Sequence, residues 1–438
     1  MKKILLITLM LVSMLYPQSK KLTLAESIEL GLQNSKDLKI SQSKMKGSDA
    51  KVSEISSMFL PQIKLFANYT RLSDNVPAFE VITPSSPIPF VISDAIFNHY
   101  TTRLSFQQPL FTGFKLSSSK KAAEYNYDAA KSEYSKEKND AAFSIHYEFW
   151  NYYRAMQVRD LIFNSLNQIE KHLIDTKNFL DNGLATQNDY LKLQVQYSNT
   201  KLLLIEAENN MNVARAVFNK ALNLPLESPT EIYTEDIKIE SVNLNVEDLI
   251  NEAKENRDEI ESLTFKLNAA NENISSERSG WYPNIYLAGG IDYSNPNYRF
   301  QPLVDEFNYN WDVRVTLNWD IWDWGSTSSK TTQAEELAVQ TQTSLEKLND
   351  IIEVEVYQNY LGVIKSQEKV DVSKLSLEQA SENYRITSEK YDVQLVTSTD
   401  LIDAEVSELQ AATNFKTSLV EYQIASTRLD KSLGRIIY

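Results

Sequence analysis

The sequence has no cysteine, only three histidines, and few residues that interrupt regular structure. Its 438 residues include 10 glycines and 12 prolines. The absence of cysteine excludes disulfides, thiolate chemistry and cysteine-bound metals. Because glycine and proline are the strongest local breakers, their scarcity favours long uninterrupted helices. The net charge of −15 at pH 7 disfavours nucleic acid as a partner, since binding to phosphates requires a basic surface.

Sequence motifs of catalysis are also missing. The histidines, His99, His146 and His172, are dispersed along the chain. Neither a His-x-x-x-His pair, a glycine-rich phosphate loop nor a G-x-S-x-G sequence occurs. Acidic pairs are frequent, but 59 acidic residues in mostly helical segments produce them by chance. We therefore predict that the protein is not an enzyme and that it uses neither a metal nor another cofactor.

The first residues are typical of a secretory signal peptide. Two lysines precede an apolar run from Ile4 to Tyr16. We place cleavage near Ser19, so that residues 1–19 form the signal; an uncleaved anchor is the alternative. The run is shorter than the roughly 20 apolar residues of a membrane-spanning helix, and no later segment is a candidate. A secreted chain of this kind can still enter a membrane as a closed β-barrel.

The rest of the chain contains the same plan twice. Residues 103–223 match residues 314–434 without a gap at an offset of 211. An earlier match at an offset of 222 relates FLPQI (residues 59–63) to WYPNI (residues 281–285). The two copies therefore differ in length in one loop only. We predict a first repeat over 20–222, a linker over 223–243 and a second repeat over 244–438.

Each repeat is expected to contain two strands, a long helix, a tip and a second helix. In the first repeat we expect strands at about 62–72 and 99–110, a long helix at about 115–181, a tip at about 182–187 and a helix at about 188–222. In the second repeat we expect strands at about 284–293 and 311–321, a long helix at about 326–393, a tip at about 394–398 and a helix at about 399–433.

The four predicted strands alternate between apolar and polar residues, which gives each strand one apolar and one polar face. The clearest alternation runs from Asp312 to Ile321. A length of about ten residues fits a tilted membrane-spanning strand, and the joining loops are rich in the aromatic residues typical of bilayer interfaces. A soluble sheet packed on one face is the alternative. Because lipid does not tolerate open sheet edges, four strands per chain require several subunits; about twelve strands leave a lumen, which favours a trimer.

The predicted helices are long enough to cross a compartment. From Lys115 to Asp181 there is neither glycine nor proline, and apolar residues recur mostly every third or fourth position, as on one helix face. At about 1.5 Å per residue, this helix is roughly 100 Å long. Such a helix, with a narrow apolar seam, needs partners along its length, as in coiled coils.

Several segments carry a family resemblance through their order and spacing. They are LTLAESIELGLQNS after the signal, FLPQI and WYPNI entering a strand, QQPLFTGF and NWDIWDWGS leaving one, and DNGLATQNDYLKLQ and DVQLVTSTDLIDAE at the tips. Over essentially the whole mature chain, this plan resembles the TolC family of outer-membrane efflux proteins. The resemblance implies a mainly helical protein with a small β part, which forms a homotrimer with a 12-strand β-barrel and a 12-helix α-barrel.

The resemblance also implies a function. It indicates the outer-membrane channel subunit of a tripartite efflux pump or type I secretion system, a passive duct that opens when a periplasmic adaptor engages its tips. The adaptor in turn joins it to an inner-membrane transporter. The expected location is the outer membrane of a Gram-negative-type bacterium, in contact with its lipid and with a helical extension into the periplasm. The alternative is a periplasmic helical adaptor or scaffold without a pore.

The resemblance assigns a periplasmic gate to the second tip. Asp400 and Asp403 match an inward-facing aspartate pair, so that a trimer would place six carboxylates around the mouth; such a ring favours cations and raises the proton affinity of some of its members. Tyr391 and Asp189 match two members of a latch, whereas Val396 stands where the family has an arginine. The alternative role of the two aspartates is to stabilise a helix N-terminus.

The tips themselves match the family's adaptor contact. Gly183 has an alternative role as a turn residue with positive φ. Lys192 stands where the second copy has Asp403, so any acidic gate belongs to the second copy. The predicted contact residues are Asn182, Gly183 and Leu184 in the first copy and Val393, Gln394 and Leu395 in the second.

Overall fold

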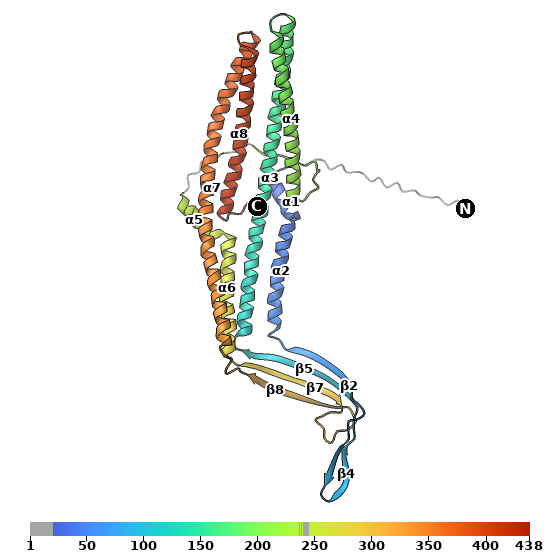
Figure 1. Ribbon diagram of the computed structural model, residues 1–438. Helices are drawn as coiled ribbons and strands as arrows, with labels where there is room; N and C mark the ends of the chain where they lie inside the picture. Colours follow the sequence, from blue (N-terminus) through green and yellow to red (C-terminus); the bar gives the residue numbers. More distant parts are fainter. Residues whose placement is uncertain (1–20, 236, 238, 240–244) are drawn as a thin grey trace, which may run out of the picture. The chain divides into compact units, whose positions relative to one another are not determined.

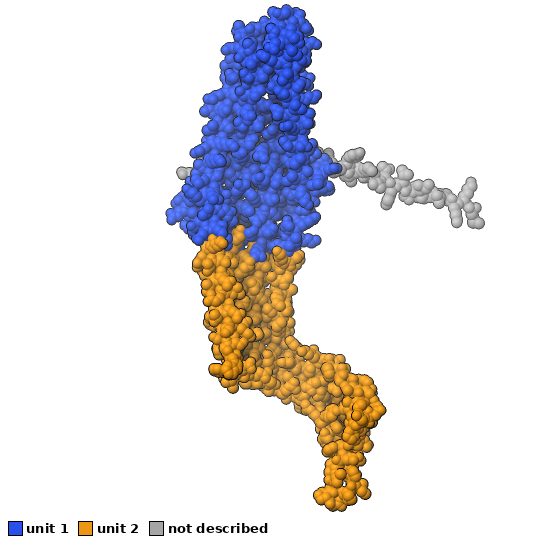
Figure 2. All heavy atoms as spheres, in the orientation of Figure 1, with its two compact units in different colours: residues 1–42, 133–258, 348–438 blue, residues 43–132, 259–347 orange. Residues whose placement is uncertain are grey.

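The computed structural model describes residues 21–235, 237, 239 and 245–438. The expected signal peptide and part of the expected linker therefore lie outside the described residues. The chain forms two compact units (Figure 2). Unit 1 consists of residues 1–42, 133–258 and 348–438, and unit 2 of residues 43–132 and 259–347. Each unit thus combines segments from both predicted repeats.

In its described residues, unit 1 consists of helices and one small parallel sheet, with the loops that join them. Two helical hairpins dominate it, one formed by α3 and α4 and the other by α7 and α8 (Figure 1). The long helices α3 and α7 also extend into unit 2. The elements are β1 (Lys21–Leu22), α1 (Leu24–Asn34), α3 (Lys115–Asp181), α4 (Gln187–Ala221), β6 (Glu231–Ile232), α5 (Val246–Asn256), α7 (Ser326–Asp392) and α8 (Ser398–Ser432).

The core of unit 1 forms where α3, α4 and α8 meet the small sheet. Phe149 and Phe218 are fully buried, and their rings pack edge to face with centroids 5.9 Å apart. Leu222 at the end of α4 and Val420 of α8 are also fully buried in this cluster. Burying a large apolar side chain contributes roughly 1.5–3 kcal/mol, so this cluster is a main source of stability for the unit.

The segment after α4 is held against the helices by hydrogen bonds. Asn219 donates to the backbone oxygens of Leu226 and Ser228 at 3.0 and 2.9 Å, and its amide oxygen accepts from Thr230 at 2.6 Å. Tyr152 of α3 donates to the Thr230 backbone oxygen at 3.0 Å. Buried polar groups of this kind are costly to leave unpaired, so the paired groups determine the path of this loop.

Unit 2 contains a four-stranded antiparallel sheet in the order β2-β5-β7-β8 (Figure 1). A separate hairpin of β3 and β4 lies in the loop between the first two strands of this sheet. The elements are α2 (Lys36–Ser57, most of it in this unit), β2 (Gln62–Arg71), β3 (Phe79–Thr83), β4 (Ser86–Ser93), β5 (Asn98–Thr112), α6 (Asp258–Glu277), the 3₁₀ helix η1 (Arg278–Trp281), β7 (Asn284–Asn295) and β8 (Asn308–Asn318).

Two features of unit 2 differ from the sequence expectation. The β3–β4 hairpin occupies a loop in which the sequence predicts no strand, because its proline-containing segment SPIPFVIS lacks a clear alternation. The last strand is expected at 311–321, whereas β8 spans Asn308–Asn318. It ends there because its pairing with β7 ends at Asn284 opposite Asn318, so the alternating residues 319–321 have no neighbouring strand to bond.

The sheet of unit 2 leaves one apolar face exposed. Cross-strand neighbours on this face include Leu65 opposite Leu104, and Leu287 opposite Val315. Leu65 and Val315 are 71% and 66% exposed. On the opposite face, the guanidinium of Arg103 forms ion pairs with Asp292 and with Asp312, the latter at 2.8 Å. The charges of Arg103, Asp292 and Asp312 are therefore paired on the polar face, whereas the apolar face has no covering layer within the described residues.

Candidate functional site

The two helical tips have the same backbone turn. After α3, the Gly183 amide donates to the Leu180 oxygen at 2.9 Å and the Leu184 amide to the Phe179 oxygen at 2.8 Å. This is the Schellman pattern, whose central residue is left-handed. Gly183 accordingly has a φ of 75°. A turn role for Gly183 is thus present in the structure, and it does not depend on any partner.

The second tip repeats this turn without glycine. The Gln394 amide donates to the Tyr391 oxygen at 2.9 Å, and the Leu395 amide donates to the Lys390 oxygen at 2.8 Å. Gln394 has a φ of 61°, a conformation in which a side chain is strained. The predicted contact residues next to the turns are exposed: Leu184 by 60%, Val393 by 65% and Leu395 by 74%. Apolar side chains therefore project from both tips.

Asp400 of the predicted gate caps the helix that follows the second tip. Its Oδ2 accepts from the Thr397 amide at 2.9 Å and from the Thr397 hydroxyl at 2.7 Å, while the Asp400 amide donates back to that hydroxyl at 3.3 Å. This is a reciprocal capping box. The hydroxyl and amide of Thr397 lower the pKa of Asp400 below its usual value. In the single chain this direction is opposite to the raised proton affinity expected of a trimeric carboxylate ring.

Two other members of the predicted gate, Asp403 and Asp189, lie near the starts of the helices that follow the two tips. Asp403 is exposed one helical turn further along α8. Asp189 caps α4 as Asp400 caps α8, with its Oδ2 2.6 Å from the Thr186 hydroxyl. The Thr186 hydroxyl, followed by Ser398, lowers the pKa of Asp189. The helix N-terminal role predicted as an alternative for Asp400 is therefore present, and Asp189 has the same role in the first copy, where it was not predicted.

The structure does not bring the two predicted latch residues into a hydrogen bond. Tyr391 is buried, and its hydroxyl lies 2.6 Å from the hydroxyl of Thr176 on α3. Asp189 instead accepts from the Ser398 hydroxyl at 2.7 Å. The first hairpin is thus joined to the second through a serine that lies two residues after Val396, the position where the family resemblance predicts an arginine.

Further hydrogen bonds join the two tips. The ammonium of Lys192 donates to the Thr399 hydroxyl at 2.9 Å, and the Gln394 side-chain amide donates to the Leu184 backbone oxygen at 3.4 Å. Neither Ser398 nor Thr399 is predicted from the sequence as a residue that bridges the two tips. Two adjacent hydroxyl residues at the start of α8, directly after the cap Thr397, are a signal, but their partners lie about 200 residues earlier in the chain.

No group of three or more His, Asp or Glu side chains suited to a metal occurs in the part of the chain that the structure describes. Of the helices in that part, none has the length and apolar character to cross a membrane.

Comparison with known proteins identifies the family. The family model described as "Outer membrane efflux protein" matches residues 28–224 and 249–435, which is most of the chain. The chain belongs to the outer membrane efflux protein family. It is therefore an efflux-channel protein and not an enzyme, as the sequence predicted, and nothing favours the alternative of an adaptor without a pore.

Individual relatives of this efflux protein are distant. The outer membrane protein TolC of Vibrio cholerae is 22% identical over 396 residues, covering 88% of this chain and 84% of the relative. The VceC structure from Vibrio cholerae superposes with a TM-score of 0.76 at 17% identity, covering 95% of this chain and 97% of that one. The Campylobacter jejuni CmeC structure gives 0.77 at 15% identity, covering 94% and 85%. At these identities the superpositions show a shared, mainly helical fold.

A buried acidic side chain near the tips of this efflux protein escaped the sequence analysis. Glu405 of α8 is only 2% exposed, and neither of its carboxylate oxygens has a hydrogen-bond partner in the described structure. Burial, followed by the nearby Glu408, raises the pKa of Glu405 to about 8. Its position in the seam beside Leu401 and Ala404 was a signal, because an acidic residue there interrupts the apolar seam of α8.

A tyrosine interacts with this carboxyl group, and a histidine contacts the tyrosine. Tyr384 of α7 lies 2.9 Å from the Nε2 of His172 on α3. Burial, followed by the charges of Glu405 and Glu408, raises the pKa of Tyr384 to about 12. Burial also lowers the pKa of His172. Burial therefore keeps Tyr384 and His172 uncharged near neutral pH, and it favours the protonated form of Glu405.

Proposed function

We propose that this protein is the outer-membrane channel subunit of a tripartite efflux pump or type I secretion system, and that three copies form a passive export duct. The observation that carries the proposal is the exposed apolar face of the four-stranded sheet, which runs across β2, β5, β7 and β8. An apolar patch that crosses four strands is unusual on a surface that faces water, and it suits a lipid environment.

The edges of this sheet support closure by copies of the same chain. Strands β2 and β8 are the two edges, and all neighbours in between are antiparallel. Consequently β2 and β8 run in opposite directions, and β8 of one copy can pair with β2 of the next in the same antiparallel pattern. Three copies supply about twelve strands, which is enough to leave a lumen. Lipid excludes open edges, which favours a closed ring in the outer membrane of a Gram-negative-type bacterium.

We assign the tips to contact with a periplasmic adaptor, which joins the duct to an inner-membrane transporter. The exposed apolar residues Leu184, Val393 and Leu395 project from turns with defined geometry. Asn182, Gly183 and Gln394 form the turns that position them. Exposed apolar side chains on a rigid turn suit recognition by a helical partner, because little conformational entropy is lost on binding.

We propose that Asp400 and Asp403 narrow and charge the mouth of the duct, with Asp189 and Tyr391 supporting the closed form. The bonds of Asp189 to Ser398 and of Tyr391 to Thr176 join the two hairpins. Adaptor binding opens the mouth by separating the hairpins, which breaks these bonds. Asp400 retains its cap in both states, since its partner Thr397 lies on the same hairpin.

Membrane insertion is tested by neighbouring substitutions on β8. Val315 lies on the exposed apolar face, and Thr316 lies on the opposite face. An arginine facing lipid near the bilayer midplane costs about 2–4 kcal/mol. We expect Val315→Arg to reduce the amount of trimer recovered from outer membranes and the number of pores in planar bilayers, while Thr316→Arg leaves both near wild type. Equal behaviour of the two variants, or a wild-type protein without pores, would contradict the duct.

The gate is tested by ion selectivity. Asp403→Asn removes an exposed carboxylate that has no capping role, and Glu208→Gln is the control at an exposed carboxylate of the first hairpin outside the gate. We expect Asp403→Asn, alone or with Asp400→Asn, to lower the preference for cations and to weaken block by multivalent cations. The control variant removes the same charge but leaves the acidic pair and the latch intact, so its selectivity should stay near wild type. Unchanged selectivity in the double variant would overturn the gate assignment.

A further inference from the structure

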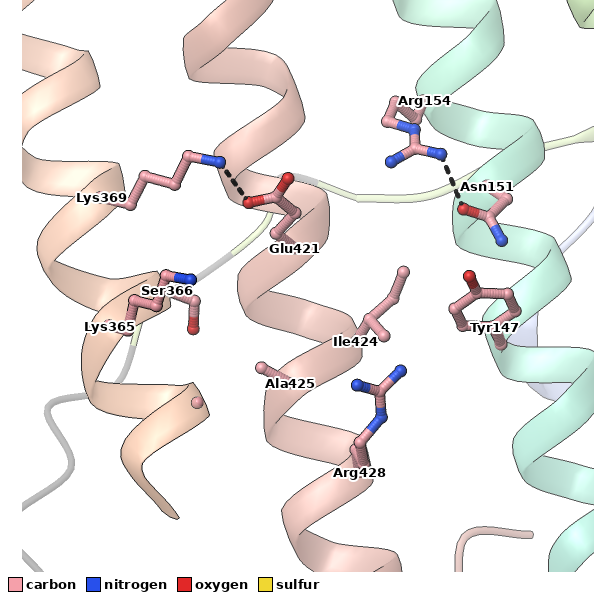
Figure 3. Close-up of a pocket in the computed structure, with 11 residues that line it drawn as sticks. Tyr147, Asn151, Arg154, Lys365, Ser366, Lys369, Glu421, Ile424, Ala425 and Arg428 are labelled. Carbon is pink, nitrogen blue, oxygen red and sulfur yellow. Dashed lines mark hydrogen bonds and ion pairs between the residues drawn. The ribbon is translucent and has the colours of Figure 1, made fainter. Parts of the chain in front are cut away.

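A groove in unit 1 collects basic side chains from three helices. It is an open cavity of about 300 Å³ between α3, α7 and α8 (Figure 3). The cations Arg154, Lys365, Lys369 and Arg428 line it, together with one carboxylate, that of Glu421. We call it the basic groove. Its lining carries four positive charges and one negative, a net charge of +3, whereas the chain has a net charge of −15.

Most of the positive charge in the basic groove is not neutralised within the described residues. Only Lys369 has a carboxylate partner, Glu421, at 2.6 Å. Arg154 donates to a neutral amide oxygen three residues earlier at 3.0 Å, and Arg428 lies over an aromatic ring at 6.0 Å. Lys365 forms neither an ion pair nor a side-chain hydrogen bond in the described chain. Three cations are thus free to interact with an anion.

The duplication shows that the fold does not require a cation at two of these positions. At the offset of 211, Lys369 corresponds to Val158 and Arg428 to Val217, whereas Lys365 corresponds to Arg154. Val158 lies in a second groove formed by α3, α4 and Thr417 of α8, whose lining includes the apolar Leu203 and the single carboxylate of Glu206, and which Arg154 also borders. The same helical scaffold therefore accepts valine where the basic groove has lysine or arginine. Packing does not explain the accumulation of like charges, which repel one another.

We propose that the basic groove binds a small anion with two or more negative charges, of the phosphate or polycarboxylate class. An arginine can pair with two oxygens of such a group, and a lysine adds a point charge. Neutral donors are also present, in the hydroxyl of Tyr147 and the amide of Asn151 (Figure 3). The cavity is at the lower end of the range for ligand sites, about 300–1,000 Å³, which selects a small molecule.

This inference goes beyond the export duct and can fail separately from it. Anion binding is measured on the purified full-length protein and needs no pore, whereas conductance needs no anion in the groove. A protein that conducts without binding the anion would therefore overturn only the site. A protein that binds the anion but forms no pore would overturn only the duct.

The test is calorimetric titration of inorganic pyrophosphate into the full chain in a non-ionic detergent at low salt. The groove variant carries Lys365→Gln and Arg428→Gln. The control variant carries Lys201→Gln and Lys374→Gln, which remove the same charge from exposed positions outside the groove. We expect saturable binding at one site per chain, weakened at least about tenfold in the groove variant and unchanged in the control.

Further measurements show whether weaker binding by the groove variant reflects loss of a specific site, unfolding of the variant, or loss of non-specific electrostatic attraction. Both variants should retain the wild-type thermal transition, and Lys365→Arg should retain binding, because the charge is kept. Absence of saturable binding by the wild type, or equal weakening in the control, would refute the site. Anionic lipid vesicles provide the second arm: binding to vesicles that pyrophosphate does not displace would assign the charges to a lipid surface and would also overturn the proposal.

Discussion

Replacing Glu405 by glutamine should change how the stability of the protein depends on pH. The folded chain holds this carboxyl with a pKa of about 8, whereas the ordinary value is 4.5. The raised pKa means that the folded state keeps the proton at a pH where the unfolded state releases it. Stability is therefore greatest below pH 4.5, falls as pH rises toward 8, and is constant above it, as far as this group is concerned.

The size of the stability change follows from the difference between the folded and the ordinary pKa of Glu405. Each pKa unit corresponds to about 1.4 kcal/mol, so the full interval represents a loss on the order of 5 kcal/mol per chain. Below pH 6.5 two histidines also affect stability. Burial lowers the pKa values of His146 and His172 from 6.5, so their contribution to stability rises with pH, opposite to that of Glu405. Above pH 6.5 both histidines are mainly neutral in both states. The interval from 6.5 to about 8 avoids the titration of the two histidines, and the contribution of Glu405 there should be a loss of roughly 2 kcal/mol.

The neighbours of Glu405 are consistent with this pH dependence. Tyr384 on α7 stays protonated throughout the interval, because its pKa is raised to about 12. Glu408 on α8 adds a second carboxyl whose pKa is raised by burial, with the same sign of slope. Lys192 on α4 bonds to the Thr399 hydroxyl and does not pair with the carboxyl.

The assay is thermal unfolding of the full chain in detergent, followed by circular dichroism between pH 6.5 and 9. Wild type should lose about 2 °C across this range, and Glu405→Gln should lose much less and be the more stable protein at the alkaline end. The control is Gln194→Glu, which places a carboxyl at the equivalent, exposed position of the first copy. That variant should retain the wild-type slope. The same slope in wild type and Glu405→Gln would show that this carboxyl does not hold its proton in the folded state.

Three further predictions concern the tips. Gln394→Gly should stabilise the second tip by about 1 kcal/mol, because glycine adopts the positive φ without strain, and slower amide exchange at the turn would record it. Thr397→Ala should lower the thermal midpoint and raise the pKa of Asp400, measurable by carboxyl NMR, since that pKa is depressed by the cap. Ser398→Ala should raise the basal conductance and accelerate exchange at the start of α8, because it removes the bond to Asp189; unchanged conductance would mean that the bond does not hold the mouth closed.

The mainly helical fold could be predicted because its causes are local. Glycine and proline are absent from Lys115 to Asp181, and α3 spans those residues. The apolar and polar faces of β8 follow from strict alternation, because successive side chains of a strand point to opposite sides. The end of that strand could not be predicted, since it depends on where β7 stops pairing.

The candidate site was only partly accessible from the sequence. Asp400 and Asp189 could be named, and a helix N-terminal role could be foreseen for Asp400 because carboxylates are favoured near the positive end of the helix dipole. The bond from Ser398 to Asp189 could not be foreseen, since it joins residues 209 apart. Tyr391 could be named as a latch, but its hydroxyl bonds to Thr176 on another helix, a partner that no local pattern indicates.

The helices, their tips, the two faces of each strand and the duplicated plan follow from the sequence alone, because helix breakers, caps and residue periods act over a few residues. The burial of Glu405 without a partner, and the gathering of Arg154, Lys365 and Arg428 in one groove, emerge only in the folded chain. Burial and the clustering of charge depend on which helices lie side by side. That arrangement is set by packing between segments far apart in the chain, and no single segment contains it.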